Sequence, residues 1–170
     1  MRLTTILPAI TLLAVGCAAT GSGSVPQESN THQTHQAGVH ERGNKAMGFS
    51  QHAATHHFRL TPDGGAIEVE ANDPKDTATR DKIRMHLEHI SQMFADGNFD
   101  APMFIHDQTP PGVPVMKRLK AEIKYEFEQT ERGARVRIKT SNQEALAAIH
   151  DFLRFQIKEH ETGDPLEIQK

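Results

Sequence analysis

Apolar and polar residues alternate along four short segments of the chain, arranged as two pairs. The first pair covers 56–60 and 66–71, with a Pro-Asp-Gly-Gly turn between them, and the second covers 123–127 and 135–139, with a Glu-Arg-Gly turn. Period-two alternation on both sides of a glycine-containing turn is typical of a β-hairpin. The sequence therefore predicts two antiparallel hairpins.

Apolar residues with helical spacing follow each hairpin and predict two core stripes: Ile83, Leu87, Ile90 and Phe94, and then Leu146, Ile149, Leu153 and Ile157. Asp73, followed by a proline, is expected to cap a helix that runs to about Ala95, and Ser141 or Asn142 caps one that runs to about Glu161. The same order of elements thus occurs twice. It predicts an α+β fold with two layers: a four-stranded antiparallel sheet with two helices on one face, as a ββα-ββα pseudo-repeat.

The connection between the two units, 98–114, contains four prolines, and is expected to be a loop rather than a helix or central strand. Charged residues alternate with apolar ones on the strands, and are expected to form a solvated sheet face. They are Glu68, Glu70, Arg135, Arg137 and Lys139.

The amino terminus has the pattern of an export signal. Met1-Arg2 is positive, and the apolar stretch from Ile6 to Val15 is too short to span a bilayer. Small residues then precede Cys17, the single cysteine, in an arrangement that resembles bacterial lipoproteins. The resemblance implies a signal peptide at 1–16, lipidation of Cys17 and a periplasmic protein anchored to the membrane. The alternative is an ordinary secretory signal, cut near Ala18 or Ala19.

Residues 17–48 contain few apolar side chains and are expected to form a flexible tether. This leaves 49–170 as one α+β domain, long enough for a single core. The formal net charge is −3, and no basic stripe is present, so nucleic-acid binding is disfavoured. No nucleophile–base pair stands out, and an enzyme is therefore the least favoured class.

Histidine is the most distinctive residue type, with 11 in the chain against no tryptophan and one tyrosine. Strand parity places His56 on the face that the helices cover, whereas His57 points away. On the helices, His86 and His150 flank the core stripes. His56, His86 and His150 are therefore expected to converge, and His57 is expected to meet His106 at an edge.

Imidazole suits copper and zinc, and a nearby methionine favours Cu(I). The histidines accordingly predict a transition-metal site in a cell-envelope protein. The competing interpretation is that each histidine is a hydrogen-bonded structural residue. In that case the protein is a non-catalytic interaction module, which uses an apolar stripe with Phe152 and Phe155 to bind itself as a homodimer or to bind an envelope partner.

Five stretches carry a resemblance to a group of small exported bacterial proteins without an established function. Some members of that group bear the name aspartate carbamoyltransferase, but that enzyme needs two doubly wound domains and an arginine-rich phosphate site, which this chain does not show. The stretches are Met47-Gly48-Phe49, Thr55-His56-His57-Phe58, Ile83-Arg84-Met85-His86-Leu87, Phe152-Leu153-Arg154-Phe155-Gln156-Ile157 and Glu159-His160-Glu161-Thr162-Gly163-Asp164.

Overall fold

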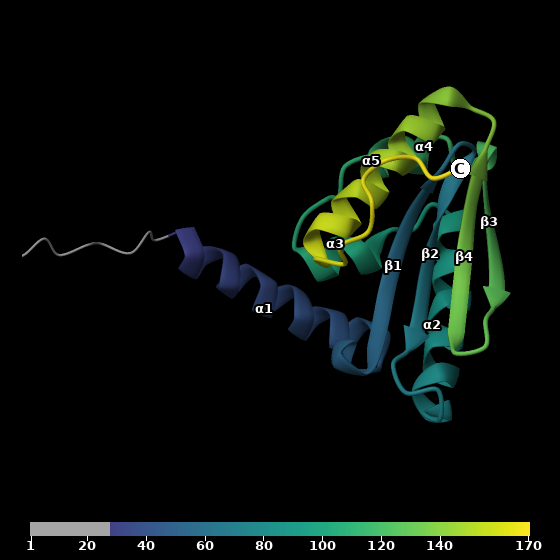
Figure 1. Cartoon of the computed structure of the whole chain (residues 1–170). Coiled ribbons are helices and arrows are strands. Elements are labelled where there is room, and N and C mark those ends of the chain that lie inside the picture. The colour runs from purple at the N-terminus through teal and green to yellow at the C-terminus, as the bar shows by residue number, and fades with distance from the viewer. Residues whose placement is uncertain (1–27) are drawn as a thin grey trace, which may run out of the picture.

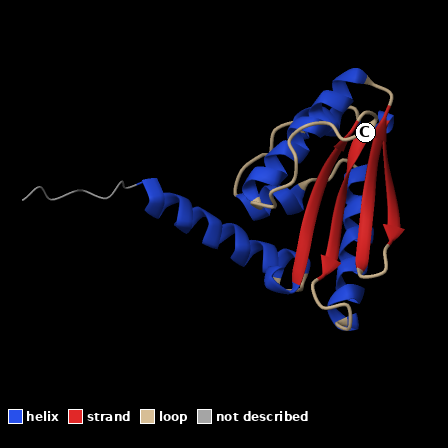
Figure 2. Cartoon of the chain, viewed as in Figure 1, coloured by secondary structure: helices blue, strands red, loops and turns tan. Residues whose placement is uncertain are grey.

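The computed structural model describes residues 28–170 and has the predicted α+β architecture (Figures 1 and 2). In this part of the chain, four strands and five α-helices follow in the order α1-β1-β2-α2-α3-α4-β3-β4-α5. Short 3₁₀ helices precede β1 (η1) and β3 (η2). The bounds are α1 Glu28–Met47, η1 Gln51–Ala53, β1 Ala54–Thr61, β2 Gly64–Ala71, α2 Thr77–Ala95, α3 Asp100–His106, α4 Val113–Arg118, η2 Lys120–Glu122, β3 Ile123–Gln129, β4 Gly133–Thr140 and α5 Gln143–Glu159.

The two hairpins join through their second strands, so the sheet order is β1-β2-β4-β3 and all neighbours are antiparallel. His56 pairs with Val69 and Phe58 with Ile67 across the first hairpin. In the second hairpin, Tyr125 pairs with Ile138. The outer strands β1 and β3 are therefore the two edges of the sheet.

Helices α2 and α5 cover one face of the sheet, as Figure 2 shows. Their predicted core stripes are buried, except that Leu146 is partly exposed. Phe94 and Phe99 stack with ring centroids 4.4 Å apart, and Phe152 meets both rings edge-on. This aromatic cluster fixes α5 against α2 because large buried rings contribute most of the apolar area removed from water.

The opposite face carries the charged residues, but it is less solvated than the sequence suggests. Glu68 is only 7% exposed, and its carboxylate lies 3.0 Å from the Arg135 guanidinium and 3.7 Å from that of Arg59. Arg135 continues the row to Glu128 on the edge strand β3. The long arginine side chains cover the carboxylate, so the expectation of a fully solvated face is wrong at Glu68.

The first helix of the repeat begins later than predicted. Asp76, not Asp73, is the N-cap of α2, and its side chain accepts a hydrogen bond from the Thr79 amide at 3.0 Å. Asp73 instead accepts from the Lys75 amide in the preceding turn. Both aspartates are good capping residues. Which of them begins the helix depends on the path of the chain in the folded structure. Asn142, one of the two predicted caps, begins α5.

Residues 28–47, predicted to belong to the flexible tether, instead form helix α1 (Figure 1). This part of the prediction is wrong because a few side chains anchor the helix to the domain. Val39 and Met47 are buried, and the Arg42 guanidinium donates to the Ile105 carbonyl at 2.8 Å. The helix has little apolar surface, so its sequence gives a weak signal.

The proline-rich connection also differs from its prediction, since it folds into α3 and α4. Pro102 is the third residue of α3 and Pro114 the second of α4. A proline in the first turn of a helix removes no internal hydrogen bond, so neither ring interrupts its helix. Gly112 precedes α4 with φ +82°, and a Cβ there would meet the Ala148 carbonyl oxygen at 2.0 Å.

The carboxyl-terminal segment lies along the free edge of β1. Asp164 accepts hydrogen bonds from the Phe58 amide and the His57 ring, both at 2.9 Å, and the Gln169 amide donates to the Leu60 carbonyl at 2.8 Å. Edge strands present unpaired backbone groups, and this segment satisfies two of them. Within residues 28–170, none of the helices has the length and apolar character that crossing a membrane requires.

Candidate functional site

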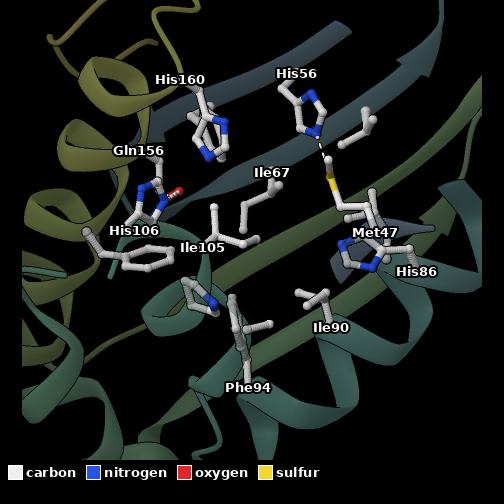
Figure 3. A pocket seen from close by; sticks show the side chains of 16 residues that line it. Met47, His56, Ile67, His86, Ile90, Phe94, Ile105, His106, Gln156 and His160 are labelled. Atoms are coloured by element: carbon white, nitrogen blue, oxygen red, sulfur yellow. Dashed lines mark hydrogen bonds between the residues drawn. The ribbon is translucent and has the colours of Figure 1, made fainter. Parts of the chain in front are cut away.

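A small cavity lies between the sheet and the helices, and four histidines line it: His56, His86, His106 and His160 (Figure 3). Its volume is about 70 Å³. The rest of the lining is mostly apolar, and of the described residues that line it none is acidic. Met47, the last residue of α1, adds a thioether.

His56 and Met47 place a ring nitrogen and a thioether sulfur side by side in the cavity. The His56 Nε2 atom lies 3.3 Å from the Met47 sulfur. Strand parity explains the position of His56, because Phe58 and Leu60 on the same face are in the core. Met47 reaches the cavity because α1 ends there and Gly48, with φ +73°, turns the chain toward η1 and β1.

His86 reaches the cavity from α2, one position before the buried Leu87. Its ring meets the Phe49 ring edge-on at 6.0 Å, and Phe49 also stacks on His56 at 6.4 Å. Figure 3 shows Met47 between His56 and His86. These three side chains therefore form one side of the cavity.

His160, directly after α5, completes the other side together with His106. The His160 ring is parallel to that of His56, with centroids 5.7 Å apart, and edge-on to that of His106 at 5.1 Å. The sequence did not predict His160 as a site residue, because it lies far along the helix from His150. The position of the α5 end beside β1, which no periodicity shows, brings it in.

His106 is the most enclosed of the four, with a side chain that is 0% exposed. Its Nε2 lies 3.1 Å from the Gln156 Oε1, and its Nδ1 lies 3.4 Å from a Glu159 oxygen that also contacts His35. The Gln156 amide thus orients the ring, while the Glu159 carboxylate approaches Nδ1 without a hydrogen bond between them. In metal sites, contacts of this kind hold imidazoles in place behind the ligands.

All four rings have a pKa below that of an ordinary histidine. Burial, followed by the charges of His86 and His57, lowers the pKa of His56 to about 4. Burial and His89 lower the pKa of His86 to about 4. The pKa values of His160 and His106 are also lowered, mainly by burial, although Gln156 and Glu159 partly oppose the shift at His106. Neutral imidazole is the form that binds metals.

The prediction that His56, His86 and His150 converge holds for the first two and is wrong for the third. The His150 Nε2 lies 2.9 Å from the Thr61 carbonyl oxygen and 3.0 Å from that of Gly64. The ring therefore fastens α5 to the turn of the first hairpin. Its hydrogen bonds to the backbone make it a structural residue.

The predicted meeting of His57 and His106 is also wrong. His57 Nδ1 pairs with Asp164 of the carboxyl-terminal segment at 2.9 Å, whereas His106 faces the cavity on the other side of β1. Strand parity had separated His57 from the core correctly. It gave no information about which segment would cover the sheet edge.

Two further predictions concern the lipidation site and the interaction surface. Cys17, the predicted lipidation site, lies outside the described residues. Phe152, predicted to share an interaction stripe with Phe155, is 1% exposed and packs inside its own chain. Phe155 is partly exposed and meets the His106 ring at 5.0 Å. Only Phe155 of the stripe is therefore accessible to another molecule.

Among residues 28–170, no three side chains of His, Cys, Asp or Glu lie in an arrangement that could hold a metal ion. The candidate ligands that remain are the imidazoles of His56 and His86 and the thioether of Met47. Comparison with known proteins adds no constraint, since no family model, no curated protein and no solved structure matches the chain. The resemblance to small exported bacterial proteins thus stays a prediction.

Proposed function

We propose that the protein binds a copper(I) ion in the histidine cavity, with Met47, His56 and His86 as ligands. The observation that carries the proposal is the 3.3 Å approach of the His56 Nε2 atom to the Met47 sulfur. Two atoms that bind one ion at ~2.0 Å and ~2.3 Å, at a tetrahedral angle, lie about 3.5 Å apart. The pair therefore needs little movement to hold an ion.

The charge of the donors favours a monovalent ion over zinc. Two neutral imidazoles and a thioether leave the full charge of the metal in a mostly apolar cavity that no acidic side chain lines. The cost of placing a charge in a poorly polarisable medium rises steeply with that charge. Thioether sulfur is in addition a soft ligand that suits Cu(I).

The size of the cavity supports an ion rather than an organic cofactor. A volume of about 70 Å³ accommodates an ion with one or two waters, since a water molecule takes ~30 Å³ of liquid. Pockets for organic ligands usually measure ~300 Å³ or more. The neutral imidazoles support the same function, because no proton has to leave before metal binds.

The test is an anaerobic titration of the purified full chain with Cu(I), in competition with a chromophoric chelator such as bicinchoninate. We expect one tightly bound ion per chain. Met47→Leu keeps the side-chain volume, and should weaken the affinity by about 10- to 100-fold, as should His56→Ala and His86→Ala. Zn²⁺ should bind more weakly than Cu(I) under the same conditions.

His89→Ala is the matched control, since it removes an exposed imidazole from α2 one turn from His86. It should leave the Cu(I) affinity unchanged. Thermal unfolding of every variant separates lost binding from lost folding. A wild-type chain that surrenders all its Cu(I) to the chelator would contradict the proposal, as would a Met47→Leu variant with wild-type affinity.

The cell-envelope location is part of the same proposal. It is supported by the apolar segment before Cys17 and by the small residues next to it. Radiolabelled palmitate should be incorporated into the wild-type chain and not into Cys17→Ser, which should move from the membrane to the soluble fraction. Equal labelling of both chains would exclude lipidation at Cys17 and leave the secretory alternative.

A further inference from the structure

A second cavity, a groove of about 270 Å³, opens beside the buried one. Its lining includes His40 from α1, His52 from η1, Glu161 and Thr162. The His40 and His52 rings face one another across it with centroids 6.0 Å apart and a tilt of 49°. A second pair of imidazoles, which sequence analysis did not connect, thus lies outside the first site.

The groove and the buried cavity have two residues in common, His56 and His160. Their rings are stacked in parallel, with centroids 5.7 Å apart. The two rings therefore stand between the groove and the cavity. An ion that passes from one to the other meets nitrogen donors on each side of this partition.

The spacing of His40 and His52 suits a single ion between them. A metal bound at ~2.0 Å from a ring nitrogen lies about 3 Å from the ring centre, so two imidazoles that bind one ion have centres about 5–6 Å apart. Two neutral imidazoles can hold a Cu(I) ion without a third ligand. The Glu161 carboxylate, which also lines the groove, supplies a negative charge that attracts cations.

We infer that His40 and His52 form an outer copper(I) site, which captures the ion and passes it between His56 and His160 into the buried cavity. This inference rests on the proposed function of that cavity. It assigns the groove a role in the rate of loading, whereas Met47, His56 and His86 set the affinity. An access route changes the rates of uptake and release together and leaves the equilibrium constant unchanged.

The experiment measures uptake of Cu(I) from its bicinchoninate complex by stopped-flow absorbance, with the full chain under anaerobic conditions. His40→Ala/His52→Ala should slow uptake and release by about tenfold, the lower end of what is lost when a group beside a metal site is removed. The equilibrium affinity of the buried site should remain that of the wild type. His40→Gln/His52→Gln, which keeps polar side chains, should behave in the same way and guards against a folding defect.

The control variant is His89→Ala, which removes an exposed imidazole that lines neither cavity. It should load at the wild-type rate. If the wild-type chain binds no Cu(I), the proposed function fails. If the wild type binds and the His40/His52 variants load equally fast, only the outer site is overturned. A loss of equilibrium affinity with faster release would place these residues among the ligands of the buried ion, and would also overturn the route.

Discussion

The two hairpin–helix units have the same architecture, but a cavity-lining histidine of the first unit is a tyrosine in the second. Counted from the turn of each hairpin, Tyr125 on β3 occupies the place that His56 has on β1, since Tyr125 pairs with Ile138 and His56 with Val69. Both side chains face the helices. The Tyr125 ring packs edge-on against Phe94 at 5.8 Å, whereas His56 lines a cavity.

The difference comes from what surrounds each unit. Helix α1 ends beside the first hairpin and supplies Met47, and the end of α5 supplies His160. The second hairpin lies under α2, and its inward face closes into ordinary core. The comparison teaches that a repeated framework gains a candidate site where segments from other parts of the chain pack against one of its hairpins.

The largest effect expected from this comparison is on stability. Phe58 and Phe127 occupy matching inward positions, but Phe58 is 3% exposed and Phe127 is only partly buried. Phe58→Ala should cost about 3–5 kcal/mol of unfolding free energy, the usual loss for a buried phenylalanine. Phe127→Ala should cost clearly less. Urea unfolding of both variants checks this, and equal losses would show that the two units are packed alike.

The second effect is a dependence on pH that arises in the first unit. Burial holds the pKa values of His56 and His86 at about 4 in the folded chain, while an unfolded histidine titrates near ~6.5. The unfolded state therefore gains protons first as the pH falls, and stability is lost between about 6.5 and 4. Above about 6.5 both states are neutral, and the effect is absent.

Thermal unfolding of the metal-free chain between pH 7.5 and 4.5 measures this loss. His86→Leu removes one of the two groups and should flatten the profile. His89→Leu removes an exposed histidine of the same helix and should leave most of the slope. A wild-type melting temperature that is constant over this range would show that the rings are solvated.

The smallest effect concerns the tyrosine of the second unit. Burial raises the pKa of the Tyr125 phenol. Its hydroxyl is buried and has no hydrogen-bond partner in the described part of the chain. Removal of an unsatisfied buried hydroxyl is close to neutral, so Tyr125→Phe should change stability by less than about 1 kcal/mol and leave Cu(I) binding unaltered. A large loss of stability would reveal a bridging water on that oxygen.

Local patterns in the sequence determined the repeated framework. Alternation predicted both hairpins, and the stripe of Ile83, Leu87, Ile90 and Phe94 predicted the buried face of α2 correctly. Capping chemistry found Asn142 but missed Asp76 by three residues, since two aspartates compete near that helix start. Each of these features depends on neighbours within one or two turns, which is why the sequence is sufficient for them.

Parity on β1 also determined that His56 faces the helices, and helical spacing placed His86 at the edge of the core. Only the tertiary structure decided which other side chains lie next to His56 and His86. His160 lines the cavity, and His150 instead contacts backbone carbonyls. Met47 lines the cavity from the end of a helix that the sequence did not predict. The physical reason is that periodicity fixes the face on which a side chain lies. The side chains that meet there depend on long-range packing, which the local sequence pattern does not determine.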